Sequence, residues 1–403
     1  MALLSVEEAL SRVLDGVEPL PSETVPIAEA SARVLAADLA ALRSQPPAAV
    51  SAMDGYAVRA ADVAGGRAEL KLIGEVAAGR PFAGSVGPGE AARIFTGGVV
   101  PPGADAVIVQ EQTERHGDIV VVAGSAQPGK HIRREALDFA RGEMLLRRGR
   151  RLSARDIALA AAMNHAEIPV RRRPKVAILA TGDELVPPGT NPGLGQIVSA
   201  NGLALSALAR AEGAEARDFG IVPDRIEPTV AALDRMRTWG ADVLVTTGGA
   251  SVGEHGLVQR ALAAQGMTLA FWKVAVRPGR PMMHARIEKT RVLGLPGNPV
   301  SAYVCAFIFL VPLLRRLTGR SDLASMTESA VLGRELAEND ERADYLRATL
   351  ERRPDGTLVA TAFAVQDSSM LASLAAADCL IIREPYAPAA PAGSRCAILE
   401  LGL

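Results

Sequence analysis

Apolar residues in the middle of the chain form short continuous runs, and stretches with helical spacing lie between them. The runs that read as strands are Val176–Ala180, Phe219–Val222, Val243–Thr246, Val274–Val276 and Val292–Leu295. The helices expected between and after them are Leu203–Ala211, Arg225–Thr238, Leu257–Ala264 and Ser301–Leu317. Continuous apolar strands separated by amphipathic helices are typical of a parallel sheet that is covered on both faces. We therefore predict a doubly wound α/β domain over residues 174–319.

On both sides of this domain the pattern changes to short apolar runs between glycine and proline turns. Before it, the runs are Leu70–Val76, Ala104–Val109 and Ile119–Val122. They predict a small β domain, inserted at residues 44–141. After it, Pro354-Asp355-Gly356 is a strong turn signal between the runs Leu346–Leu350 and Leu358–Thr361. This predicts a C-terminal β-barrel-like domain over residues 320–403.

Helical spacing also occurs in the two segments that remain. A helix is expected at residues 5–15, with a capping box that starts at Ser5, and another at Ala154–Met163. We predict that residues 1–43 and 142–173 come together as one discontinuous N-terminal domain.

Composition and charge narrow the classes of partner. A formal net charge of −1 provides no basic surface for nucleic acid, so an anionic ligand must be held by local basic residues. The 3 cysteines include no Cys-x-x-Cys pair, which argues against structural zinc or a disulfide framework and fits a reducing cytoplasm. The first residues lack the basic start of a signal peptide. The apolar stretch Pro299–Leu314 is short and contains Pro312, which favours a buried helix over a membrane span. We therefore expect a cytoplasmic protein without nucleic-acid or membrane partners.

Polar residues gather where the predicted strands end, which is where open α/β sheets bind ligands. Asp183 and Glu184 follow the first run, and they form either a polar turn or a metal or acid–base site. The loop after Val243–Thr246 contains Gly248, Gly249, Ser251 and Gly253. Such a loop serves either a tight turn or the approach of backbone N–H groups to a phosphate.

Two further loops have both a structural and a functional interpretation. The segment after the last run contains Pro296, Asn298, Pro299 and Ser301, and it either enters a helix or binds a ligand. Asp224, with Glu227 three residues later, matches a capping box. It also follows a strand end and can face the same cleft.

Basic residues cluster at Lys273, Arg277 and Arg280. Alternation along a strand would place Lys273 and Arg277 on one face, where they suit a phosphate or another oxyanion, unless the strand is a solvated edge. In the inserted region, Asp54 and Thr96 taken alone are turn residues. Carboxylates for Mg²⁺, basic residues and glycine loops are together the equipment for chemistry on a phosphoanhydride or phosphate ester.

Motifs in one consistent order resemble the MoeA family of molybdopterin molybdenumtransferases, a family also found as the E domain of gephyrin. They are Ser51-Ala52-Met53-Asp54-Gly55-Tyr56-Ala57-Val58, Arg93-Ile94-Phe95-Thr96-Gly97, Thr181-Gly182-Asp183-Glu184-Leu185, Gly248-Gly249-Ala250-Ser251-Val252-Gly253, Pro278-Gly279-Arg280-Pro281 and Gly294-Leu295-Pro296-Gly297-Asn298-Pro299-Val300-Ser301. The resemblance covers nearly the whole chain, and the motifs in register are far more specific than any one alone.

The resemblance implies four domains and an elongated homodimer. The cleft would lie between the α/β domain of one subunit and the inserted β domain of the other. Adenylylated molybdopterin and molybdate would be the substrates, and molybdenum-loaded cofactor and AMP the products, with Mg²⁺ as the metal cofactor. The substrate's dithiolene sulfurs would ligate molybdenum, which agrees with the few cysteines. Molybdopterin adenylyltransferase and molybdoenzymes or carrier proteins are the further partners that it implies.

The resemblance also assigns roles to residues. The catalytic set is Asp54, Thr96, Asp138, Asp183, Glu184 and Asp224, with Glu184 and Asp224 as the metal ligands. The substrate-binding set is Gly248, Gly249, Ser251, Gly253, Lys273, Arg277, Arg280, Pro296, Asn298, Pro299 and Ser301, together with Arg347 and Ser368, whose match is looser in spacing.

Three departures from the family pattern bear on activity. Gly256 stands where the family usually has a carboxylate, so a metal or pterin contact is expected to be missing. Arg277 and Arg280 stand where the family often has lysine, which keeps the charge and changes the geometry. Ala136 stands where a glycine often precedes the carboxylate of Asp138.

Two other functions remain open alongside the molybdenumtransferase. One is a molybdopterin adenylyltransferase, since the α/β domain resembles that family too; those proteins, however, are typically the α/β domain alone. The other is a non-catalytic paralogue that carries cofactor, or a scaffold like the E domain of gephyrin. The glycine at position 256 favours this last alternative.

Overall fold

The computed structural model describes residues 3–248, 256–323 and 327–402, so Gly249, Ser251 and Gly253 of the predicted glycine loop lie outside the described residues. The chain divides into two compact units, and each is described by itself. The first unit consists of Met1–Glu23, Ala32–Ala36 and Val170–Leu403, and the second of Thr24–Ser31 and Ala37–Pro169. The strands β1 (Ser22–Pro26) and β12 (Glu167–Arg171) contain points where the chain passes from one unit to the other.

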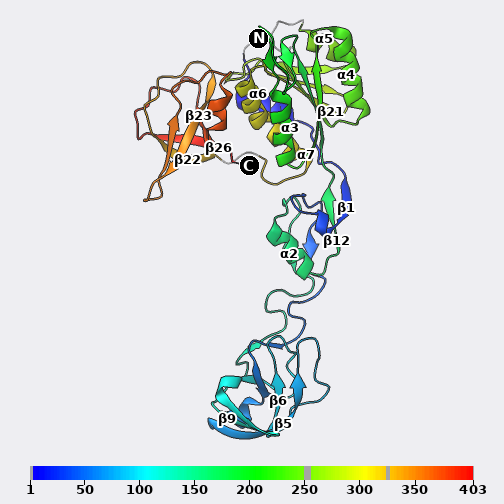
Figure 1. Ribbon diagram of the computed structural model, residues 1–403, viewed down its shortest axis with the longest axis vertical. Coiled ribbons are helices and arrows are strands. Elements are labelled where there is room, and N and C mark those ends of the chain that lie inside the picture. The colour runs from blue at the N-terminus through cyan, green and yellow to red at the C-terminus, as the bar shows by residue number, and fades with distance from the viewer. Residues whose placement is uncertain (1–2, 249–255, 324–326, 403) are drawn as a thin grey trace. The chain divides into compact units, whose positions relative to one another are not determined.

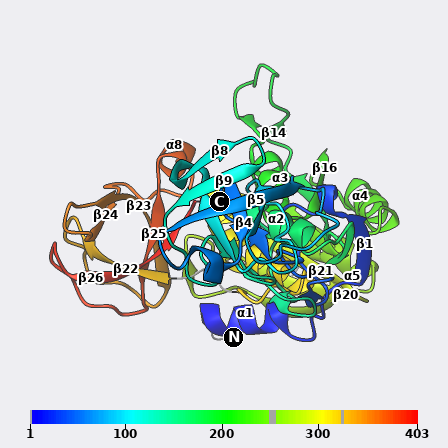
Figure 2. The ribbon, with the colours of Figure 1, turned by 90° about the horizontal axis from the view of Figure 1, so that it is seen from below.

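A six-stranded sheet forms the centre of the first unit, in the order β16-β13-β17-β21-β20-β18. Its strands are β13 (Lys175–Thr181), β16 (Glu215–Val222), β17 (Val243–Thr247), β18 (Thr268–Trp272), β20 (Met283–Ile287) and β21 (Thr290–Leu295). The first four strands in this order are parallel, as predicted. The other two run antiparallel at one edge and were not predicted, because His284 and Arg286 interrupt the apolar pattern of β20. Two short strands, β14 (Leu185–Val186) and β15 (Ile197–Val198), pair in parallel, and the loop between them stands out from this part of the unit (Figure 2).

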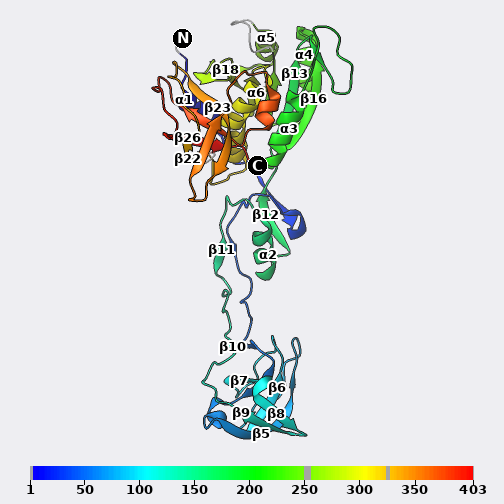
Figure 3. The same cartoon turned by 60° about the vertical axis from the view of Figure 1, so that its left-hand side comes forward.

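Helices cover both faces of this sheet, which confirms the doubly wound arrangement (Figures 1 and 3). One face packs against α1 (Val6–Leu14), α3 (Asn201–Ala211) and the helical segment made of α6 (Pro299–Cys305), the π-helix η4 (Ala306–Leu310) and α7 (Val311–Leu317). The other packs against α4 (Ile226–Thr238) and α5 (Leu257–Ala264). Strand β13 shows why both faces of the sheet must be covered. Its residue Ile178 packs into the core under α1, α3 and α6, and Leu179 packs into the core under α4 and α5, and neither side chain has exposed surface.

The segment Pro299–Leu317 is, within the described part of the chain, the one helix long and apolar enough to cross a membrane. Since 83% of its apolar window is buried inside the protein, it is a core helix, as the sequence predicted.

A closed barrel forms the last part of the first unit. Its strands are β22 (Thr327–Leu332), β23 (Ala343–Arg352), β24 (Leu358–Ala362), β25 (Cys379–Arg383) and β26 (Arg395–Glu400), with the short helix α8 (Leu371–Ala375). The barrel closes because β23 pairs with both β24 and β25, and the predicted turn at Pro354-Asp355-Gly356 joins β23 to β24.

The predicted strand Val274–Val276 is not part of the α/β sheet. The backbone of Lys273 has φ 83°, which ends the extended conformation of β18. The strand that follows, β19 (Val276–Arg277), pairs with β23 of the barrel. The expectation that Lys273 and Arg277 share one face of one strand is therefore wrong.

The second unit is built on a six-stranded sheet in the order β7-β4-β6-β5-β9-β8. Its elements are η1 (Ile27–Glu29), β2 (Leu39–Ala40), β3 (Val50–Ser51), β4 (Gly55–Val58), η2 (Ala60–Val63), β5 (Arg67–Val76), β6 (Glu90–Ile94), β7 (Ala106–Val109), η3 (Gln110–Gln112), β8 (Thr113–His116), β9 (Ile119–Ala123), β10 (Ile132–Arg133), β11 (Met144–Leu146) and α2 (Ala154–Ala162). Buried aliphatic residues such as Val120 and Ile94 form its cores, which confirms the predicted β domain.

The two segments of the predicted N-terminal domain do meet, because β2 pairs with β11, but helix α1 does not share this domain with α2. Ala9 and Val13 of α1 are buried in the main core of the first unit, whereas α2 belongs to the second. The Ser5 hydroxyl accepts the backbone N–H of Glu8 at 3.1 Å, as expected for a cap. The other half of the predicted capping box is replaced, because the Glu8 carboxylate accepts from Arg12 at 2.6 Å.

Candidate active site

Loops from four neighbouring parallel strands meet at one edge of the α/β sheet. Residues 182–184 follow β13, residues 223–225 follow β16, Gly248 follows β17 and residues 296–298 follow β21. In parallel sheets these carboxyl ends form the usual ligand edge. The structure thus brings six of the predicted residues to the same edge, namely Asp183, Glu184, Asp224, Gly248, Pro296 and Asn298.

Two glycines allow these loops to approach one another. Gly182 has φ +154°, and a Cβ there would lie 2.5 Å from the Glu184 carboxylate. Gly248 has φ +85°, and a Cβ there would lie 2.3 Å from the Thr181 carbonyl oxygen. An L side chain strains the backbone at either position, and at Gly248 it also collides with the Thr181 main chain, whereas the Glu184 carboxylate can move aside. Both glycines are therefore required for the loop packing.

Carboxylates gather between the loops after β13 and β16. The backbone N–H of Asp224 donates to Asp183 Oδ1 at 3.1 Å. Partial burial of the Asp224 carboxyl, followed by the negative charges of Asp183 and Glu184, raises its pKa above the usual value. In the described part of the chain, none of these carboxylates belongs to a salt bridge. This edge of the sheet therefore carries negative charge that a cation would relieve.

Asp224 does not cap helix α4. The N-cap residue is Arg225, and no side chain caps the helix there. The capping-box interpretation of Asp224 and Glu227 is therefore wrong, and the carboxylate of Asp224 is available for a ligand.

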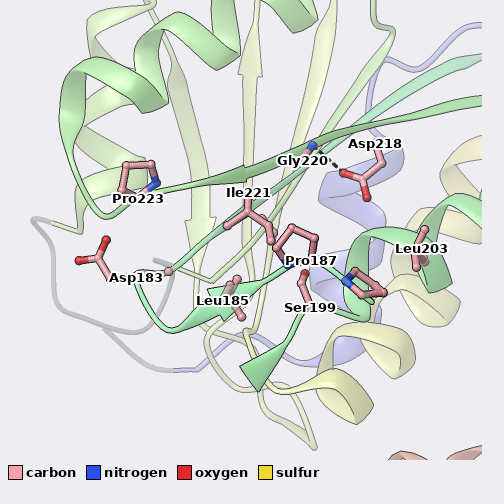
Figure 4. A pocket seen from close by; sticks show the side chains of 12 residues that line it. Asp183, Leu185, Pro187, Ser199, Leu203, Asp218, Gly220, Ile221 and Pro223 are labelled. Atoms are coloured by element: carbon pink, nitrogen blue, oxygen red, sulfur yellow. Dashed lines mark hydrogen bonds between the residues drawn. The ribbon is translucent and has the colours of Figure 1, made fainter. Parts of the chain in front are cut away.

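A cavity of about 460 Å³ opens beside this carboxylate group. It is lined by Ala180, Gly182, Asp183, Leu185, Pro187, Pro188, Ser199, Leu203, Asp218, Gly220, Ile221 and Pro223. Figure 4 shows Asp183 near Pro223 on one side and Asp218 on the other, where Asp218 accepts the backbone N–H of Gly220 at 2.8 Å. An apolar wall with a few polar groups is typical of a small-molecule pocket.

The loop after β21 is fixed from two directions. The Asn298 side-chain amide donates to the Ser368 hydroxyl of the barrel at 2.7 Å, so two predicted substrate-binding residues are in contact. Pro299 occupies the first turn of α6, as predicted, where its missing N–H costs nothing. Pro296 and Ser301 are buried, so their side chains support the loop rather than line an open surface.

Arg277 is not free to bind an anion. Its guanidinium donates to both carboxylate oxygens of Asp344, to Asp340 at 3.1 Å and to the Asn339 side chain at 2.9 Å. The hydrogen bonds to Asp344 raise the pKa of Arg277 despite partial burial. The predicted role in substrate binding is therefore corrected: Arg277 joins β19 to the barrel.

Lys273 and Arg280, the other two residues of the basic cluster, are not held as Arg277 is by the carboxylates that the structure describes. The Lys273 ammonium lies 4.0 Å from the centre of the Trp272 ring, a cation–π arrangement. Arg280 is exposed, and its backbone carbonyl accepts from Val274. Within the residues that the structure describes, neither side chain is in a salt bridge, so both remain candidates for an anionic ligand.

Arg347 is also misassigned as a direct substrate ligand. It is only 1% exposed, and its guanidinium donates to Gln366 Oε1 and to the carbonyl oxygens of Asp367 and Met370. These bonds hold the loop that contains Ser368. Its role is to position that loop.

In the second unit, Asp54 and Thr96 form a pair. Asp54 Oδ1 accepts the backbone N–H of Thr96 at 2.7 Å and its hydroxyl at 2.8 Å. These two bonds, backbone first, lower the pKa of Asp54. Asp138 is exposed in a different loop, where its backbone N–H donates to Gln45 at 2.9 Å. The interpretation of Asp54 as a simple turn residue misses its contact with a second motif.

Gly256 precedes α5 with φ −53° and ψ 141°. Any residue adopts this conformation, so the backbone does not require glycine at the position where the family usually has a carboxylate.

Among the described residues, no group of three or more His, Cys, Asp or Glu side chains is arranged to hold a metal. The pKa values of Cys305 and Cys379 are raised to about 12 by burial, so these thiols stay protonated. Mg²⁺ does not need three protein ligands, because it often takes one or two carboxylates and completes its shell with phosphate oxygens and water. Glu184 and Asp224 fit that requirement.

The sequence reasoning missed two polar residues near this edge. Asn201, the first residue of α3, donates its side-chain amide to the Gly297 carbonyl oxygen at 2.8 Å. Asp218 lines the cavity from the middle of β16. The sequence did indicate Asp218, because a carboxylate inside a strand is unusual. It gave no such indication for Asn201, which is an ordinary residue at a helix start.

Models of known protein families match nearly the whole length of this chain. Three family models cover the chain: the MoeA N-terminal region (domain I and II) over residues 4–164, a model described as "Probable molybdopterin binding domain" over 177–316, and the MoeA C-terminal region (domain IV) over 329–401.

Relatives of similar length are also found. Molybdopterin molybdenumtransferase 2 of Mycobacterium tuberculosis is 35% identical over 88% of this chain and 89% of its own. The molybdopterin molybdenumtransferase of Haemophilus influenzae is 32% identical over 95% of both chains. A solved structure of the molybdopterin biosynthesis MoeA protein from Pyrococcus horikosii matches with a TM-score of 0.87 and 30% identity over 100% of both chains. The chain thus belongs to the MoeA family of molybdopterin molybdenumtransferases.

Proposed function

We propose that this protein inserts molybdate into adenylylated molybdopterin and releases AMP. The observation that carries the proposal is the group of Asp183, Glu184 and Asp224 at the ligand edge of the α/β sheet, beside a cavity of about 460 Å³. The anhydride of an adenylylated substrate brings negative phosphate oxygens, which require a cation next to these carboxylates. The family membership supports the same reaction.

Mg²⁺ is the cation that we propose, with Glu184 and Asp224 as its protein ligands. When bound, it would neutralise the charge of the phosphate oxygens during anhydride cleavage. Burial, followed by the charges of Asp183 and Glu184, raises the pKa of Asp224, and a bound cation would relieve the repulsion between these charges.

The remaining residues bind and orient the substrate in this proposal. Asn298 and Ser368 present a fixed amide and hydroxyl pair next to the loop after β21. Lys273 and Arg280 supply positive charge for a phosphate or oxyanion. Gly248 lets the loop after β17 pack against Thr181, next to the loop that carries Asp183 and Glu184. Molybdate is a substrate, and its sulfur ligands would come from the pterin.

AMP release from adenylylated molybdopterin, measured with and without molybdate, tests the proposal. We expect release that depends on molybdate and falls when Mg²⁺ is chelated. Adenylylation of bare molybdopterin by ATP would show the protein to be an adenylyltransferase instead. Tight binding of the adenylylated substrate without either reaction would show a carrier or scaffold, and the glycine at position 256 is the feature that would explain it.

We further propose a cytoplasmic homodimer whose catalytic site takes Asp54 and Thr96 from one subunit and Glu184 from the other. This follows the family resemblance. It is supported by the placement of Asp54 and Thr96 in one compact unit and of Glu184 in the other. Molybdopterin adenylyltransferase would supply the substrate, and a molybdoenzyme or carrier protein would accept the product.

A further inference from the structure

A second cavity lies at the edge of the α/β sheet opposite the candidate active site. Its volume is about 650 Å³, and it is lined by Gly16, Val17, Glu18, Pro19, Leu20, Pro21, Arg172, Asp242, Arg286, Glu288, Lys289, Arg291 and Leu317. Arg172 and Asp242 come just before β13 and β17, and Arg291 is at the beginning of β21. These are the amino ends of strands whose carboxyl ends form the candidate active site. The two cavities are therefore separate.

Arg291 is the unusual residue of this cavity. It is only 7% exposed, and its Nη2 donates to the Asp15 carbonyl oxygen at 2.8 Å. Its Nη1 is buried and has no hydrogen-bond partner. Buried donors in folded proteins are nearly always paired, and an unpaired guanidinium nitrogen beside a cavity indicates a missing acceptor.

A second guanidinium reaches the same place. Arg286 Nη2 donates to the carbonyl oxygen of Asp15 at 2.6 Å and to its carboxylate at 3.0 Å. A Cβ at Gly16 would lie 3.8 Å from Arg286 Nη1 and 3.9 Å from Arg291 Nη2. Both arginines thus meet at the turn that follows helix α1. Lys289 adds an exposed ammonium at the rim.

Acidic residues around the cavity pair with only some of its basic side chains. The Asp242 carboxylate accepts from both guanidinium nitrogens of Arg172, at 2.8 and 3.0 Å, and is thereby occupied. Glu18 and Glu288 also line the cavity and are exposed to solvent. Among the described residues, neither Arg291 nor Lys289 has a carboxylate within salt-bridge distance.

We propose that this cavity binds a phosphate group. Planar guanidinium forks match phosphate oxygens, and a dianionic group suits two arginines with a lysine beside them. Nη1 of Arg291 lacks an acceptor, and a small turn of this guanidinium would let a phosphate oxygen in the cavity supply one. Pro19, Leu20 and Leu317 give the remaining wall an apolar character, so a small phosphate ester fits the cavity better than the free ion.

Calorimetric titration of the full-length protein tests the proposal, with inorganic phosphate and phenyl phosphate as the probes. We expect both to bind, and phenyl phosphate to bind more tightly because the apolar wall contributes. Equal affinities would identify free phosphate as the ligand of the same site. Absence of binding by either probe at millimolar concentration would overturn the proposal.

Variants assign the binding to this cavity. Arg291→Met should weaken phosphate binding about tenfold, as expected for the loss of a charged hydrogen bond. Lys289→Gln, an exposed change that leaves the core intact, should weaken it about threefold. Arg353→Gln removes an exposed arginine in a turn of the barrel and should change nothing. If Arg291→Met does not fold, Lys289→Gln decides the question. Parent-like affinity in the folded variants would place the phosphate elsewhere and overturn the proposal.

Discussion

The protein holds catalytic carboxylate candidates in two opposite electrostatic environments. In the second unit, two hydrogen bonds from Thr96 lower the pKa of Asp54. In the first unit, partial burial and the charges of Asp183 and Glu184 raise the pKa of Asp224. Hydrogen-bond donors dominate at the first carboxylate, whereas burial and like charges outweigh the one backbone hydrogen bond, from Asp183, at the second.

Asp54 is therefore preorganised, whereas Asp224 and its neighbours need a bound ligand to balance their charge. Neutral donors keep Asp54 ionised and fix its orientation before any substrate arrives, which is how fixed dipoles contribute to catalysis. The cluster around Asp224 becomes favourable only when a cation or a proton joins it. We therefore expect changes in the first unit to alter metal dependence, and changes in the second to alter pH dependence.

The largest effect is expected for Glu184→Gln. The amide keeps the shape of the side chain and removes the charge that a cation requires, so molybdate-dependent AMP release should fall by roughly 100-fold or more. Glu227→Gln, an exposed change in the first turn of α4, is the matched control and should keep parent activity. Near-normal release by Glu184→Gln at saturating Mg²⁺ would remove this residue from the mechanism.

Mixing two inactive proteins tests whether both kinds of carboxylate serve one site across subunits. Asp54→Asn and Glu184→Gln should each be inactive alone. After unfolding and refolding together, random pairing should restore roughly a quarter of the activity, because half of the sites in each mixed dimer are intact. Light scattering checks that dimers form. If the mixture stays inactive although mixed dimers are present, each site draws its residues from a single chain.

A smaller effect, visible in the pH profile, is expected for Thr96→Val. This change removes the hydroxyl bond and keeps the backbone bond, so the pKa of Asp54 should rise part of the way to its usual value. A lowered pKa keeps the carboxylate ionised as the pH falls, and the variant should therefore lose activity at a higher pH than the parent. Thr96→Ser retains the hydroxyl and should keep the parent profile. Identical acidic limbs for all three proteins would show that ionised Asp54 is not needed.

The smallest effect is expected for Gly256→Asp. The backbone at this position, with φ −53°, accepts aspartate without strain, and an anion near the start of α5 is favoured by the helix dipole. The added carboxylate should lower the Mg²⁺ concentration for half-maximal AMP release by about threefold. Gly256→Asn is the uncharged control. An unchanged or higher Mg²⁺ requirement in the aspartate variant would mean that the missing carboxylate is already compensated.

Strand ends and helices of the α/β domain could be read from the sequence, because their signals are local. The run Val243–Thr246 became β17 with one more residue, and the helix predicted at Leu257–Ala264 has those bounds. The carboxylates at 183 and 184 follow β13 as expected. Parallel strands place all such ends on one edge, so linear order alone predicted which residues meet there.

Assignments that depend on long-range pairing could not be read in this way. Arg277 looked like an anion ligand because Asp344, its partner, lies 67 residues later in the chain. Arg347 looked available because the carbonyl groups that it binds belong to a loop without regular structure. The packing of α1 against the α/β core likewise depends on α7, which lies about 300 residues later in the chain.

The core helix Pro299–Leu317 has a consequence for biosynthesis. Before folding, its apolar sequence has the length and composition of a membrane span, and exposed segments of this kind promote aggregation. Its packing partners in the same core include Val176, Ile178 and Val243, all of which precede it in the chain. During N-to-C-terminal synthesis the strands that cover this helix therefore leave the ribosome before it, whereas the barrel residues of the same core, such as Tyr345 and Leu380, follow it.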